Sequence, residues 1–203
     1  MYDTDKLDNY LKKLFDEKKY PSLTVCIRGP EGIIFEKGYG YCDSGKTKSA
    51  GIDTVYGIAS MSKSLTSLAC AILGKLSFSD PVTKYFPQFS IPGTPKESVT
   101  LRHLAMHTAG IPPIPPLEWS IVMNTPGRVS EEAKKLIESA PNKMDTIEDI
   151  IDYIANSGEY EPLGAPGECM SYSNDAYAIL SYVVDQAAGI PLEQFLKERI
   201  FEP

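Results

Sequence analysis

Strand-like sequence is confined to one short part of this chain, and helical patterns fill most of the rest. Residues 22–28 and 33–41 are rich in β-branched and aromatic side chains, and the Gly-Pro-Glu-Gly sequence at residues 29–32 is typical of a hairpin turn. Two strands alone do not make a stable sheet in water. The pattern therefore predicts an α+β protein whose sheet is incomplete within this chain.

Apolar residues recur at helical spacing on both sides of the hairpin. Helices are expected at residues 5–18, from Ser60 to Gly74, at 100–107, from Ser130, from Thr146 to Gly158, at 174–188 and from Pro191. The proline-rich residues 111–117 must form an extended connector, because proline cannot continue a helix. We expect residues 1–80 to hold the N-terminal helix, the hairpin and the next helix, and residues 81–203 to form a mostly helical region.

Charge and hydropathy narrow the class of protein. The formal net charge is −7 and the pI is about 4.9, which argues against nucleic-acid binding and against a polybasic membrane patch. No apolar run is long enough to span a bilayer, and the charged N-terminal segment does not resemble an export signal. We therefore expect a soluble cytoplasmic protein without a membrane span.

The cysteines and histidines give little sign of a metal centre. Cys26, Cys42, Cys70 and Cys169 are widely scattered, and we expect them to be reduced and buried. His103 and His107 are four residues apart, as two metal ligands on a helix can be, but no third ligand is evident and a structural role is the stronger interpretation. The sequence predicts neither a metal nor a cofactor.

A serine and a lysine stand together at the predicted start of one helix. Ser60 and Lys63 are one helical turn apart, so their side chains share a face. A serine hydroxyl becomes a useful nucleophile only when a base takes its proton, and a neutral lysine amine can be that base. The alternatives are that Ser60 caps the helix and that Lys63 is a solvated surface residue.

Two later motifs follow this pair in order. His-Thr-Ala-Gly occupies residues 107–110, and Pro-Gly-Glu at 166–168 precedes Tyr172-Ser173-Asn174. With the S-x-x-K motif, this order resembles the serine β-lactamase and penicillin-binding-protein superfamily, above all class C β-lactamases with their related esterases and D-aminopeptidases. The resemblance runs from about residue 5 to residue 203, with an alanine where the family's H-T-S-G segment has serine.

The resemblance implies a fold, a reaction and four site residues. The fold would be β-lactamase/transpeptidase-like, an antiparallel sheet flanked by helices plus a helical region. Ser60 would be the catalytic nucleophile, Lys63 and Tyr172 would carry protons, and Asn174 would bind the substrate amide. The chain would then be a serine hydrolase that forms an acyl-enzyme with a β-lactam, a D-amino-acid peptide or amide, or an ester. Alternatively, Tyr172 is a half-buried core residue and Asn174 caps its helix.

One family motif is missing from this sequence. The family carries K-T-G or H-x-G on a strand beyond the Y-x-N helix, and neither follows Tyr172 here. We therefore expect a fragment without the C-terminal strands, weakly active or inactive by itself, whose sheet a second chain or a C-terminal segment completes. The alternative function is a catalytically silent binding module of the same fold.

Overall fold

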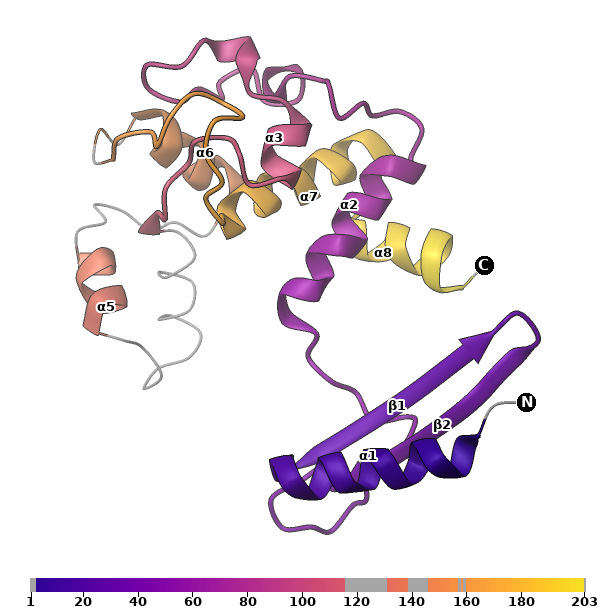
Figure 1. The fold of residues 1–203 in the computed structure, drawn as a ribbon. Helices are drawn as coiled ribbons and strands as arrows, with labels where there is room; N and C mark the ends of the chain where they lie inside the picture. The colour runs from indigo at the N-terminus through magenta and orange to yellow at the C-terminus, as the bar shows by residue number, and fades with distance from the viewer. Residues whose placement is uncertain (1–2, 116–130, 139–145, 157, 159, 203) are drawn as a thin grey trace. The chain divides into compact units, whose positions relative to one another are not determined.

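The chain forms two compact units, Met1–Ile58 and Ala59–Pro203, drawn in Figure 1. The computed structural model describes residues 3–115, 131–138, 146–156, 158 and 160–202. The units divide after Ile58, whereas the sequence predicts a division near residue 80. The helix that follows the hairpin therefore belongs to the same compact unit as the later helices.

The first unit is a helix packed on a two-stranded hairpin (Figure 1). Its elements are α1 (Thr4–Lys18), β1 (Ser22–Gly29) and β2 (Gly32–Gly40). The strands are antiparallel, from the pair Ser22 and Gly40 to the pair Gly29 and Gly32, with a bulge after Ile27. The predicted helix, both strands and the hairpin turn between them are confirmed.

Asp8 fastens α1 to β2. Its carboxylate accepts hydrogen bonds from Lys37 Nζ at 2.8 Å and Tyr39 Oη at 2.7 Å, and it pairs with Lys12 Nζ at 3.0 Å. These partners, Lys37 first, hold the pKa of Asp8 well below its usual range. Burial, together with the Asp8 hydrogen bond, raises the pKa of Tyr39. The carboxylate is thus charged at neutral pH and in mild acid.

Replacing Asp8 by asparagine should weaken the first unit in a pH-dependent way. A carboxylate with a depressed pKa stabilises the fold above its unfolded pKa of about 3.9, and this stabilisation is lost as the pH falls further. The difference in unfolding free energy between wild type and Asp8→Asn should be largest near neutrality and shrink in acid. Denaturant unfolding across pH measures it, and a constant difference would contradict the assignment. Asp16→Asn, on the exposed side of α1, is the matched control.

The second unit is helical and is built around α7. Its helices are α2 (Ser62–Ile72), α3 (Leu101–Ala105), α5 (Glu131–Glu138), α6 (Ile147–Asn156), α7 (Asn174–Ala188) and α8 (Leu192–Leu196). Short turns of 3-10 helix lie at Ala59–Met61, Val82–Lys84 and Lys96–Ser98, and a π-helical turn lies at Lys197–Phe201. Figure 1 shows α7 beneath α3 and α6 and beside α2. None of the described helices is long and apolar enough to cross a bilayer.

The core of this unit surrounds the buried face of α7. Its apolar side chains at residues 179, 180, 183 and 184 are fully buried, which is the spacing of one helix face. They join Leu104 from α3 and Ile154 from α6 in one cluster. Gly189 ends α7 with a positive φ of 78°, as the sequence predicts. The core thus fixes where α7 begins and which way its first residues face.

Some expectations need correction or fall outside the described residues. The helix predicted at 100–107 ends at Ala105 because the chain turns out of the helix at Met106 and His107. Only Cys70 is buried, whereas Cys26, Cys42 and Cys169 are exposed free thiols on the hairpin and in loops. The predicted cap at Ser130 lies outside the described residues, as do residues 116 and 117 of the proline-rich connector.

Truncating Leu104 tests the core assignment. Its side chain is fully buried, so Leu104→Ala should lower the free energy of unfolding of the second unit by about 2–5 kcal/mol. Leu163→Ala is the control, because Leu163 is half-exposed and should lose far less. Equal losses in the two variants, measured by denaturant unfolding, would mean that Leu104 is not part of a packed core.

Candidate active site

Ser60 lies on a tight turn that leads into α2. It is the middle residue of the 3-10 turn Ala59–Met61, and Ala59 has a positive φ of 46°. Ser62 Oγ donates to the Ala59 carbonyl at 2.7 Å and braces the turn. No side chain caps the start of α2, so the Ser60 hydroxyl does not act as a helix cap here. The Ser60 hydroxyl therefore remains available for hydrogen bonds with other side chains.

Lys63 reaches both Ser60 and the start of α7. Its Nζ donates to Ser60 Oγ at 3.3 Å and to Asn174 Oδ1 at 2.6 Å. Ser173, not Asn174, caps α7, because its Oγ accepts from the backbone N–H of Ala176 at 3.0 Å. This leaves the Asn174 amide free to meet the lysine, and corrects the alternative in which Asn174 is the cap.

Tyr172 completes the cluster from the residue before that cap. Its Oη donates to Ser60 Oγ at 2.6 Å, although the two residues are 112 apart in sequence. The side chain is 46% exposed, so it is not a packed core tyrosine. The structure thus brings together all four predicted site residues, within one compact unit.

Three aromatic rings surround the lysine end of the cluster. Lys63 Nζ lies 4.9 Å from the ring centroid of Tyr172 and 5.6 Å from that of Tyr177. The His107 ring lies 4.4 Å and 5.1 Å from the same two rings, centroid to centroid. Tyr177 Oη donates to the Ala105 carbonyl at 2.8 Å and meets Ser67 Oγ at 3.0 Å. Tyr177 therefore ties α7 to both α2 and α3.

Sequence reasoning did not assign Tyr177 or His107 to the site. Tyr177 is one helical turn beyond Asn174, so its face was predictable once α7 was placed. His107 belongs to the His-Thr-Ala-Gly segment, and its ring accepts a hydrogen bond from Ser173 N at 3.1 Å through Nδ1. His103 Nδ1 bonds Thr100 instead, in a capping box on α3. No group of three metal-ligating side chains occurs among the residues that the structure describes.

Two groups in the cluster have shifted pKa values. The nearby Lys63 amine first, and then the hydrogen bond with Ser60, lower the pKa of the Tyr172 phenol below the ordinary value. Burial, and then the charge of Lys63, lower the pKa of His107. A phenol that ionises more readily next to a serine hydroxyl is suited to take a proton from it.

Backbone hydrogen bonds join the loop that carries the Pro-Gly-Glu segment to the residues that follow His107. Gly167 N donates to the Thr108 carbonyl at 2.8 Å, and Leu163 N donates to the Gly110 carbonyl at 3.0 Å.

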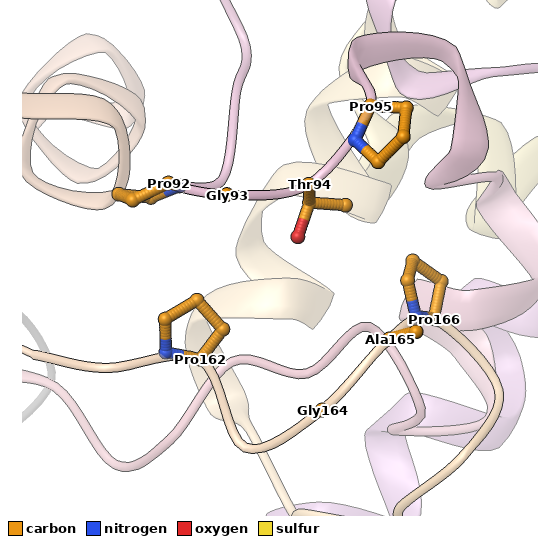
Figure 2. A pocket seen from close by; sticks show the side chains of 8 residues that line it. All are labelled: Pro92, Gly93, Thr94, Pro95, Pro162, Gly164, Ala165 and Pro166. Carbon is orange, nitrogen blue, oxygen red and sulfur yellow. The ribbon is translucent and has the colours of Figure 1, made fainter.

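The same loop borders a partly open hollow of about 310 Å³, shown in Figure 2. Its lining comes from two loops: Pro92, Gly93, Thr94, Pro95, Pro162, Gly164, Ala165 and Pro166. None of these residues belongs to the Ser60 cluster.

Comparison with known proteins decides the family. Residues 7–203 match the beta-lactamase family model. The chain belongs to the beta-lactamase family. It is 28% identical to penicillin-binding protein 4* of Bacillus subtilis over 96% of its own length and 39% of that protein. It is 24% identical to a beta-lactamase of Escherichia coli over 98% of its length and 46% of that protein. The beta-lactamase-family chain thus spans less than half the length of these relatives.

Solved structures agree with this assignment. One similar structure is an octameric penicillin-binding protein homologue from Pyrococcus abyssi, with a TM-score of 0.75 and 28% identity. The match covers all of this chain and 43% of the homologue's chain. A beta-lactamase/D-alanine carboxypeptidase from Pseudomonas syringae shares the fold, with a TM-score of 0.68 and 20% identity. The predicted superfamily and its α+β, β-lactamase/transpeptidase-like fold are confirmed.

The shifted phenol gives a direct test of the cluster. One of the 12 tyrosines should ionise below the ordinary value of about 10, and this component should vanish in Tyr172→Phe. Lys63→Met should return it to a higher pH, because the phenolate then loses its cationic partner. Ultraviolet difference titration measures each step. A wild-type titration identical to that of Tyr172→Phe would contradict the geometry.

Proposed function

We propose that this beta-lactamase-family chain carries the catalytic machinery of a serine acyl hydrolase. Ser60 is the nucleophile, Tyr172 transfers its proton, Lys63 stabilises the Tyr172 phenolate, and Asn174 holds Lys63 and binds the substrate amide. The observation that carries the proposal is the double engagement of Ser60 Oγ, at 2.6 Å from Tyr172 Oη and 3.3 Å from Lys63 Nζ. A nucleophile within hydrogen-bond reach of its base is the geometry that such catalysis needs.

Acylation begins with loss of the Ser60 proton. The Tyr172 phenolate, which forms more readily beside Lys63, accepts that proton while Ser60 Oγ bonds to the substrate carbonyl carbon. The tetrahedral intermediate then expels its leaving group, which takes the proton from Tyr172. The carbonyl carbon remains bound to Ser60 as an ester.

Deacylation uses the same groups in reverse. Tyr172 takes a proton from water as the water oxygen attacks the ester carbonyl, and the proton passes to Ser60 Oγ as the acid product leaves. The backbone N–H of Ser60, at the start of the turn into α2, can donate to the oxyanion in both steps. Asn174 keeps its side-chain N–H₂ for the substrate amide, since its Oδ1 already accepts from Lys63.

The substrates we propose are carbonyl compounds that the relatives' names suggest. Penicillin-binding protein, beta-lactamase and D-alanine carboxypeptidase are the printed names of similar proteins. They favour a β-lactam or a peptide ending in D-alanine, with D-amino-acid amides and small esters as further members of the class. Every one presents a carbonyl that a serine hydroxyl can attack.

Covalent labelling tests the proposal. Incubation with a fluorophosphonate or a penicillin should give an adduct on Ser60, located by peptide mass spectrometry. Ser60→Ala should abolish it, and Lys63→Met and Tyr172→Phe should slow it by about 10²–10⁴-fold, the usual value of a positioned proton carrier. Ser64→Ala is the matched control, because Ser64 is an exposed serine on the same helix.

Two labelling results would contradict the hydrolase proposal. If neither reagent modifies Ser60, or if Ser60→Ala is labelled as fast as wild type, the hydrolase proposal is wrong. A binding module of the same fold would then be favoured, and equilibrium binding of a penicillin without an adduct would support it.

A further inference from the structure

We propose that His107 is a positioning residue that holds Tyr172 and Asn174 onto Ser60 and Lys63 only while its imidazole is neutral. The inference rests on the proposed acyl-transfer function and adds a group that the four-residue site does not contain. It would make acylation sensitive to acid through a residue that touches neither the nucleophile nor the substrate.

His107 holds the backbone on both sides of Tyr172. Its Nδ1 accepts the Ser173 N–H at 3.1 Å, and its carbonyl accepts the Ser171 N–H at 2.8 Å. Its ring lies against the Tyr172 ring at 4.4 Å. His107 thus contributes to the position of the Tyr172 phenol and of Asn174, which directly follows Ser173.

The backbone of His107 is adapted to this task. Its φ is +59°, in the left-handed region where histidine and asparagine are among the more tolerated side chains. This turn takes the chain out of α3. Sparsely populated backbone conformations persist where surrounding contacts hold them, and they cluster at functional sites.

The contact with Ser173 requires one protonation state. A backbone N–H can donate to Nδ1 only if that nitrogen keeps its lone pair, so the proton of the neutral ring is on Nε2. Protonation at Nδ1 would point an N–H at the Ser173 N–H. The bond would break, and the segment that carries Tyr172 and Asn174 would lose its anchor.

The surroundings favour the neutral ring. It faces Tyr172 before α7, Tyr177 on α7 and, through its charge, Lys63 on α2. Burial first, and the Lys63 charge second, lower the pKa of His107 below its ordinary value of about 6.5. The ring is thus mostly neutral at pH 7 and becomes charged only as the pH falls below that ordinary value. His107 therefore holds the Tyr172 segment in place above the pKa of its imidazole, and this hold is lost as the pH falls through that pKa.

Two variants of His107 separate the hydrogen bond from the ring. In His107→Asn, Oδ1 can replace Nδ1 as the acceptor, the left-handed backbone is tolerated, and nothing titrates. In His107→Phe the ring remains but the acceptor is gone. The rate constant for phosphonylation of Ser60 by a fluorophosphonate, measured from pH 5 to pH 8, is the readout.

The expected profiles differ in kind. The labelling rate of wild type should fall below the pKa of His107, and this fall should be absent in His107→Asn. His107→Phe should be slower by about 10- to 100-fold at every pH, which is the effect expected of a small misplacement of the reacting groups. His103→Asn removes the other histidine and should keep the wild-type fall. Superimposable wild-type and His107→Asn profiles would overturn the proposal.

A second readout does not depend on turnover. In ¹⁵N NMR spectra, His107 should show the Nε2–H form at neutral pH, and the Ser173 amide signal should shift as His107 titrates but not in His107→Asn. A Ser173 signal that ignores the titration would overturn the role of His107. If wild type is not labelled on Ser60 at any pH, the proposed function is wrong, and the role of His107 is wrong with it. The two failures are therefore distinguishable.

Discussion

The site depends on a single ammonium group held between two helices. Lys63 Nζ donates to Asn174 Oδ1 at 2.6 Å and to Ser60 Oγ, and it lies over the rings of Tyr172 and Tyr177. Hydrogen bonds with a charged donor are roughly twice as strong as neutral ones. Because Lys63 and Asn174 are 111 residues apart, this bond links α2 to the start of α7. Ser60, Lys63, Tyr172 and Asn174 lie together where α2 meets the start of α7.

Backbone strain marks the edges of this arrangement. Within the second unit, the described residues with positive φ that are not glycine are Ala59 and His107. Ala59 immediately precedes Ser60, and His107 is hydrogen-bonded to the segment that carries Tyr172. Such conformations cost free energy, so the packed core beneath α7 and the hydrogen bonds of Tyr177 must hold them in place. The rigid interior of the unit thus supports the geometry of its surface.

All four site residues belong to the compact unit Ala59–Pro203. Their mutual distances therefore do not depend on where the hairpin unit sits. The cluster of Ser60, Lys63, Tyr172 and Asn174 is thus formed within a chain that spans less than half the length of its relatives.

The sequence by itself determined the local elements and the chemical types at the site. The hairpin turn, the helix that Gly189 ends and the Ser60–Lys63 pair all follow from spacing and from turn chemistry, which neighbouring residues settle. Only the tertiary structure decided which groups meet. It ended α3 before His107, gave the cap of α7 to Ser173 and left three of the four cysteines exposed. These outcomes depend on contacts between residues far apart in the chain, which no local pattern encodes, and so the roles of His107 and Tyr177 emerged only in three dimensions.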